Sequence, residues 1–323
     1  MKRINQYLIG LLILILGLDG GALHAQKSAL VRANTILAEN PLKAVKILDS
    51  VVRHAETKTL SVSWTLRGRA YYELCRVQNY STKTELLDSI FISVQRSFNY
   101  LPDSNITKDN YILLRYISKR FYNMASLQLK DTTLMKSMAA DKSNNAAALL
   151  KRYHANALTN FNKFKSIYET YFPNMDVRKY ELEFYEALGS YFSYLFEKDN
   201  SNAEAGSLAK SAYLKVLQID PNNVFANIQM GLLYYNQAAN IIQKLNEDTP
   251  LEELDLVQDN LVKLGKQSEQ FVSKGYQNDQ NNLKAIEALF YIYRLLNDFN
   301  KSNEFKSLGL QKGLKLEETQ PQK

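Results

Sequence analysis

Apolar side chains recur at three- and four-residue steps over long stretches of the chain, and this period predicts amphipathic helices. The pattern is fullest between residues 182 and 236, where large apolar residues alternate with small ones. Asp220 and Pro221 divide this stretch, because proline disfavours the helical conformation in the residue before it. Gly189 and Gly231 lie inside the predicted helices, where glycine costs about 1 kcal/mol relative to alanine. We therefore expect a neighbouring helix to approach too closely there for a Cβ atom.

Similar paired segments follow one another along the chain and predict about six antiparallel helical hairpins. Glycine and proline are sparse, at 12 and 6 residues, which favours helices over sheets. No Pro-, Gly- or Ser-rich linker divides the chain, so we expect one repeat domain over residues 26–316 rather than independent helical bundles. The predicted segments are 28–54, 64–98, 111–129 with 150–171, 182–220, 224–271 and a sixth from about 283, followed by a last helix around 301–314.

Several segments carry helix-start signals. Asn40 precedes Pro41, which is a favourable N-cap residue followed by proline at the first helical position. Residues 82–85 and 201–204 have the form of capping boxes. Thr249 and Pro250 resemble another helix start. The polar stretch 131–145 is interpreted mostly as a loop.

The order of residues between 182 and 236 resembles the tetratricopeptide repeat, a helix-turn-helix unit of roughly 34 residues. The matching positions are Tyr185, Leu188, Gly189 and Phe192, then Ala209, Tyr213 and Val216, then Asp220 and Pro221. The resemblance implies an all-α, right-handed α-solenoid in which the first helices of the hairpins line a concave groove. It also implies that the groove holds a protein or peptide partner. The implied groove positions are Thr65, Arg69, Tyr72, Glu73, Glu183, Glu186, Ser190, Tyr194, Phe225, Ile228, Leu232, Tyr235 and Asn236.

The first 25 residues have the pattern of a secretory signal peptide. Lys2 and Arg3 precede an apolar run, and Ala25 is a small residue at the expected cleavage point. The alternative is an uncleaved membrane anchor, but the run is shorter than the ~20 residues needed to span a bilayer. No cysteine follows the run at a position suited to lipid attachment. We therefore expect an exported protein, periplasmic or secreted, with no transmembrane span after cleavage and a disordered tail over residues 317–323.

The formal net charge of +7 is unevenly distributed. Lys and Arg clearly outnumber Asp and Glu between residues 26 and 150, whereas the two kinds are nearly balanced from residue 151 onward. A basic N-terminal half is suited to an acidic protein, lipid headgroups or an anionic glycan. Scattered solubilising charge is the alternative. Nucleic acid is not favoured, because the charges do not gather on a binding motif.

The residues that usually carry enzyme chemistry are few. His54, His154 and Cys75 do not make a metal cluster of the usual spacing. No phosphate-binding glycine loop occurs, so no cofactor is expected. Three glutamates gather at Glu181, Glu183 and Glu186, but on a helix such acids are typically solvated surface charge.

The leading hypothesis is therefore an exported, non-enzymatic scaffold that binds a protein or peptide partner during cell-envelope assembly or secretion. The alternative is a glycan- or nutrient-binding helical protein similar to those of outer-membrane uptake systems. Neither the partner nor the oligomeric state follows from the sequence. Charge reversal at Arg69 or alanine at Tyr235 is expected to weaken partner capture.

Overall fold

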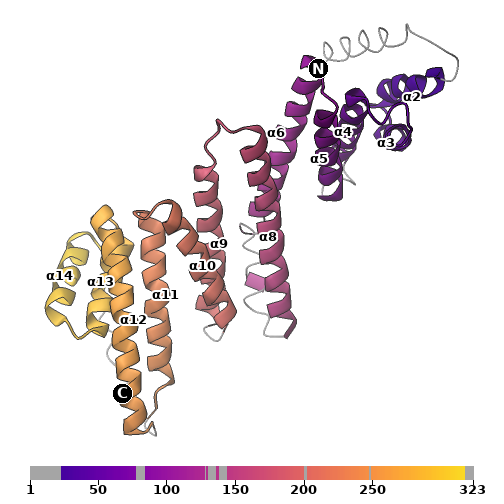
Figure 1. The fold of residues 1–323 in the computed structure, drawn as a ribbon. Helices are drawn as coiled ribbons and strands as arrows, with labels where there is room; N and C mark the ends of the chain where they lie inside the picture. Colours follow the sequence, from indigo (N-terminus) through magenta and orange to yellow (C-terminus); the bar gives the residue numbers. More distant parts are fainter. Residues whose placement is uncertain are drawn as a thin grey trace. The chain divides into compact units, whose positions relative to one another are not determined.

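The computed structural model describes residues 23–77, 84–127, 129, 136–137, 144–199, 202–246 and 249–316 (Figure 1). In this part of the chain the long elements are all α-helices and no strand occurs, so the predicted all-α class is confirmed. The first helix, α2, begins at Leu23, slightly before the expected start of the fold. The apolar run of the expected signal peptide and residues 317–323 lie outside the described residues.

The chain packs as two compact units, residues 1–123 with 162–174 and residues 124–161 with 175–323. The boundary falls inside α6 and α8, so each of these helices contributes to both units. The expectation of one uninterrupted repeat domain over residues 26–316 stays a prediction.

Unit 1 consists of hairpins followed by a long helix. Helices α2 and α3 pack against each other, as do α4 and α5, and α3 also packs against α4. The long helix α6 meets the C-terminal part of α8, where the Tyr122 and Phe164 ring centroids are 5.1 Å apart. The bounds are α2 Leu23–Ile36, α3 Pro41–Val51, α4 Ser61–Cys75, α5 Thr84–Asn99, α6 Ser104–Leu127 and α8 Asn144–Tyr171.

Unit 2 contains the first part of α8 and three successive hairpins, α9–α10, α11–α12 and α13–α14. Consecutive hairpins also touch, through α10 with α11 and α12 with α13, as Figure 1 shows. This stacking of antiparallel hairpins is the arrangement of an α-solenoid. The bounds are α9 Arg178–Lys198, α10 Ala203–Ile219, α11 Val224–Lys244, α12 Leu251–Asn278, α13 Leu283–Leu295 and α14 Phe299–Gln311.

Asparagine side chains begin several of these helices. The Asn40 carbonyl oxygen accepts from the Lys43 N–H at 3.0 Å, which confirms the predicted cap of α3. In unit 2 the N-cap of α10 is Asn202, one residue after the start of the predicted capping box, because its side chain accepts from the Ala205 N–H. The start of α12 has no side-chain cap at Pro250. The first half of the predicted box at 82–85 and most of the loop at 131–145 lie outside the described residues.

Glycines mark the closest contacts between paired helices, as the sequence predicts. A Cβ on Gly231 of α11 would overlap Val272 of α12 and lie 2.8 Å from the Ser268 carbonyl oxygen. The Ser268 hydroxyl donates to the Gly231 carbonyl at 2.7 Å. A Cβ on Gly189 of α9 would overlap the Tyr213 ring of α10. The missing side chains therefore allow α9 to pack directly on α10, and α11 on α12.

None of the helices in the described ranges is both long enough and apolar enough to cross a membrane.

Candidate partner-binding surface

In unit 1, Thr65 is an interior residue rather than a groove residue. Its side chain is fully buried and its hydroxyl donates to the Asn110 side-chain oxygen at 2.9 Å. The Ser97 hydroxyl lies 2.8 Å from the Thr65 hydroxyl and accepts from the Asn110 amide at 2.9 Å. This buried polar group joins α4, α5 and α6, and it leaves Thr65 inaccessible to a partner. The groove position expected at Thr65 is therefore corrected.

Arg69 and Tyr72 both lie where α4 meets α6. An Arg69 guanidinium nitrogen is 3.6 Å from the Asp109 carboxylate. Burial raises the pKa of Asp109, and the nearby Arg69 charge opposes that shift. The Tyr72 ring meets Tyr116 edge-to-face, with centroids 4.6 Å apart. Both predicted residues are only partly exposed, and both contact the neighbouring first helix.

Glu73 is engaged within its own helix. Its carboxylate accepts from the Arg76 guanidinium at 3.0 Å. The same guanidinium lies 5.9 Å from the centroid of the Tyr72 ring. Apart from the buried Thr65, the predicted positions in unit 1 are thus half-buried, and the charges of Arg69 and Glu73 are paired with neighbouring side chains.

In unit 2, the predicted positions on α9 differ in what they contact. Glu183 is exposed and pairs weakly with Lys179 across one helical turn, at 3.9 Å. Glu186 instead accepts a hydrogen bond of 2.8 Å from the Asn223 amide at the start of α11. Tyr194 is half-buried, with the Lys198 ammonium 5.6 Å from its ring centroid.

Ser190 is half-buried on the same helix, and its hydroxyl donates to the Glu186 carbonyl at 2.8 Å. A hydroxyl bonded in this way to the preceding turn is partly satisfied without a partner. Ser190 is therefore a weaker contact position than Glu183 or Tyr194.

The five positions on α11 range from exposed to buried. Phe225 is 38% exposed and meets the Tyr213 ring at 6.1 Å. Leu232 and Asn236 are half-buried. Ile228 is 3% exposed, because it packs into the core formed with α12 and α13, so its expected groove position is corrected.

Tyr235 connects α11 to α13. Its ring lies 6.5 Å from the Tyr291 ring, and burial raises its pKa while the Arg294 charge opposes that shift. Tyr291 and Arg294 were not predicted as groove residues. A signal for them exists in the sequence, since both flank the Ile286, Leu289 and Tyr293 stripe of α13 at helical spacing.

The predicted positions of unit 2 lie on helices that contact one another. Helix α11 contacts α9 and α13 in addition to its hairpin partner α12. The first helices of three successive hairpins are therefore neighbours. We call their shared surface the first-helix face. It comprises Glu183, Tyr194, Phe225, Leu232, Tyr235, Asn236, Tyr291 and Arg294.

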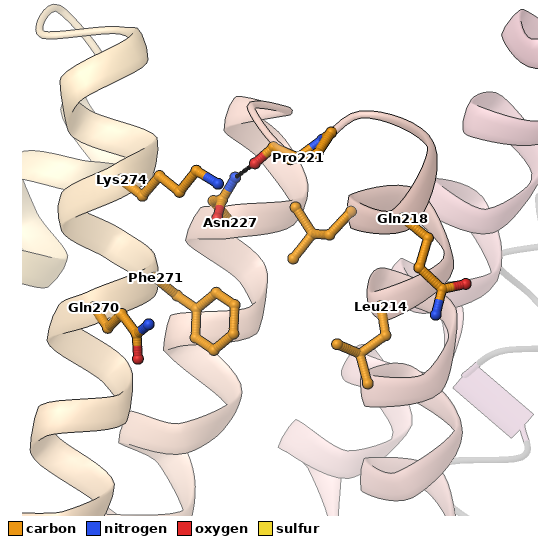
Figure 2. A pocket seen from close by; sticks show the side chains of 8 residues that line it. Leu214, Gln218, Pro221, Asn227, Gln270, Phe271 and Lys274 are labelled. Atoms are coloured by element: carbon orange, nitrogen blue, oxygen red, sulfur yellow. Dashed lines mark hydrogen bonds between the residues drawn. The ribbon is translucent and has the colours of Figure 1, made fainter.

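A separate cleft opens between the second helices α10 and α12. Figure 2 shows Leu214, Phe271 and Lys274 around it, with the Asn227 amide donating to the Pro221 carbonyl oxygen at 3.1 Å. The cleft has a volume of about 290 Å³ and a mainly apolar wall. Its single charged lining residue is Lys274. It offers apolar contact area but few groups that would orient a ligand.

Burial shifts the pKa values of Cys75 and His154. Burial raises the pKa of the Cys75 thiol to about 11. Burial lowers the pKa of His154, whose ring meets Phe192 at 5.5 Å. Among the described residues no group of three His, Cys, Asp or Glu side chains is placed to hold a metal ion.

No family model and no curated protein matches the chain. Among solved structures, it is similar to the C-terminal part of a TPR repeat-containing protein from Cytophaga hutchinsonii. The sequence identity is 13%, the match covers 88% of this chain and 95% of that chain, and the TM-score is 0.29. At that TM-score the likeness adds nothing to the fold, which follows from the helices and their contacts alone.

Proposed function

We propose that this chain is a non-enzymatic scaffold of the tetratricopeptide type, exported from the cytoplasm, whose first-helix face binds a segment of a partner protein. The main support is that α11 contacts both α9 and α13. Adjacent first helices form a continuous surface several helices wide, which a single helix cannot offer. The tetratricopeptide-like residue order between Tyr185 and Pro221 supports the same proposal.

The chemistry of the first-helix face suggests what the partner segment presents. Phe225, Tyr235 and Tyr291 are partly exposed aromatic residues, and such residues supply apolar contact area at low cost in conformational entropy. Glu183 is exposed at the α9 edge and Arg294 is half-buried at the α13 edge. We expect a segment with aliphatic or aromatic side chains that meet α11 and a cationic residue that meets Glu183.

The proposal is tested by photo-crosslinking on the full-length protein in the cells that express it. A photoreactive phenylalanine analogue at Phe225 is expected to crosslink one discrete partner. The same analogue at Leu256, which is 72% exposed on α12, serves as the control for non-specific contact. Equal crosslinking from both positions would contradict the first-helix face.

A charge test complements the crosslinking. Glu183→Lys reverses a charge on the face, and Asp259→Lys makes the same change on an exposed position of α12. We expect Glu183→Lys to weaken capture of the crosslinked partner about tenfold, since a well-placed charge pair contributes roughly 1 kcal/mol or more. Asp259→Lys is expected to leave capture unchanged. Similar melting temperatures for both variants exclude a folding defect.

The compartment and the binding of glycans remain separate questions. Export rests on the charged and apolar pattern of residues 1–25, and cleavage is checked by N-terminal sequencing of the mature protein. The glycan alternative is tested by titrating oligosaccharides into the protein. If they bind, and if Glu183→Lys and Phe225→Ala both abolish that binding, the ligand of the first-helix face is a glycan rather than a protein segment.

A further inference from the structure

A second cavity in unit 2, of about 510 Å³, lies at the other end of α11. It is bounded by the end of α9, the start of α10, the last turns of α11 and the first half of α12. Phe196 and Leu264 form a buried apolar floor. A Cβ on Gly206 would lie 3.1 Å from the Phe196 ring, so the glycine allows α10 to pack directly on that floor.

Among the described residues that line this cavity, both charged side chains are lysines. Lys210 and Lys244 both line it, and none of the other lining residues is charged. The Lys210 ammonium is 4.7 Å from the centroid of the Tyr234 ring. Lys244 lies in the last turn of α11, where a cation interacts favourably with the helix dipole. Within the described part of the chain, no carboxylate oxygen lies within 4.0 Å of either ammonium.

Polar groups and apolar groups occupy the same cavity. Ser207, Gln237, Asn240 and Asn260 supply hydrogen-bonding groups around the lysines. Ile241 adds apolar surface beside the floor. The volume falls within the roughly 300–1,000 Å³ range of small-molecule sites, which are mostly apolar with a few polar groups that set orientation.

We infer that this two-lysine cavity binds a small amphipathic anion. Its carboxylate or phosphate head lies between Lys210 and Lys244, and its apolar body covers Ile241 and the floor. Lys210 is half-buried and Lys244 is exposed, and neither has a carboxylate partner among the described residues. Two ammonium groups lining one cavity favour an anion by electrostatic attraction. The apolar floor favours an anion with an apolar body over an inorganic anion, because an inorganic anion has no apolar surface to bury there.

This site is distinct from the first-helix face. The α11 residues that line the cavity recur at three- and four-residue steps from Gln237 to Lys244. The helical period of 3.6 residues places Gln237, Ile241 and Lys244 on the side of α11 away from Leu232 and Tyr235, with Asn240 between the two sides. The experiments on this cavity and on the first-helix face therefore test two independent proposals, and either can be refuted without the other.

The test is isothermal titration calorimetry on the whole protein with four ten-carbon probes below their micelle concentrations. Decanoate and decyl phosphate carry the two anionic heads, decanol is neutral, and decyltrimethylammonium is cationic. We expect at least one anion to bind about tenfold more tightly than decanol, and no heat from the cation. The tighter anion identifies the head group. Orthophosphate alone is expected not to bind.

Variants locate the binding. The double variant Lys210→Gln/Lys244→Gln is expected to lower the affinity for the anion at least about tenfold. Hydrogen bonds to charged groups are stronger than those between neutral groups, and this variant removes both charges. Lys215→Gln, an exposed lysine of α10 outside the cavity, is the matched control and should change nothing. Ser207→Trp fills the mouth from an exposed position and should abolish binding while both lysines remain.

Three results would overturn the inference. The first is decanol or the cation binding as tightly as the anions. The second is anion binding that survives the double lysine substitution. The third is equal loss in Lys215→Gln, which would indicate attraction by general surface charge rather than by this cavity.

Discussion

Single residues in this protein are constrained mainly by how closely two helices pack. Gly231 shows this most directly, because α12 occupies the space that a side chain would need. Cys75 is constrained differently, since it is buried beside Tyr116 and Arg120 and its thiol is held in the neutral form. The surroundings thus decide which side chain fits at residue 231 and how the side chain of Cys75 behaves.

Gly231→Ala is expected to lower the free energy of unfolding by about 1–3 kcal/mol, although alanine favours helices more than glycine does. The cause is overlap with Val272 and with the Ser268 backbone, which cannot move independently of α12. Urea unfolding measures the change. Gly265→Ala is the control, because its closest contact is the flexible end of Leu296 at 2.7 Å, and a smaller loss is expected. Equal losses at both positions would contradict the backbone argument.

Cys75 is expected to react slowly with thiol reagents in the native protein. A pKa raised to about 11 from the ordinary 9.0 lowers the thiolate fraction at pH 8 about a hundredfold, and burial limits access as well. Colour development with a disulfide reagent should be slow at pH 8 and rise with pH towards 11. Rapid reaction in urea gives the reference rate. A native rate near that reference would show that α4 does not bury the thiol.

At the scale of the element, a side chain in the turn between two hairpins forms hydrogen bonds to both hairpins. Asn223 caps α11 by accepting from the Ala226 N–H at 2.8 Å, and its amide simultaneously donates to Glu186 on α9. One residue therefore both starts a helix and joins it to the preceding hairpin. The same Asn cap recurs in unit 2 at Asn202 and Asn282.

A double-mutant cycle tests this connection. Glu186→Ala is expected to cost about 1 kcal/mol, and Asn223→Ala about 1–2 kcal/mol, because the second change also removes the cap. The double variant should lose less than the sum, since the hydrogen bond between the two residues can be lost only once. Chemical denaturation of the four proteins measures the coupling, and strictly additive losses would show that the contact contributes nothing.

At the scale of the whole molecule, stability is expected to vary along the stack in unit 2. Helix α11 contacts α9, α10, α12 and α13, whereas α14 packs on α13 and buries only Ser302 and Gly309. A helix with a neighbour on one side buries less surface, so its local unfolding costs less free energy.

Native-state hydrogen exchange should therefore be faster in α14 than in α11. The expected order of protection within unit 2 is α11 and α12 highest, α13 intermediate and α14 lowest. Mass spectrometry of peptic fragments gives the rates. Uniform protection from α11 to α14 would mean that the hairpins open together, and the picture of separable stacked units would be wrong for this protein.

The predicted groove positions differ in how far they are exposed, and partner binding at them stays a prediction. Glu183 and Phe225 are exposed, and Tyr194, Leu232 and Tyr235 are partly exposed. Thr65 and Ile228 are interior, and Glu186 serves the contact between hairpins. Periodicity locates the apolar stripe of a helix, but a residue at the edge of the stripe can face solvent or a third helix. That choice depends on residues far away in the chain.

The sequence by itself determined the helices, the caps such as Asn40 and the close approach at Gly231, because each depends on residues within one or two turns or on the cost of glycine in a helix. Only the tertiary structure placed α13 beside α11, bringing Tyr291 and Arg294 next to Tyr235. It also gathered Lys210 and Lys244 around one cavity. Such neighbours lie on different helices, and their proximity is set by how hairpins stack, which no local pattern encodes.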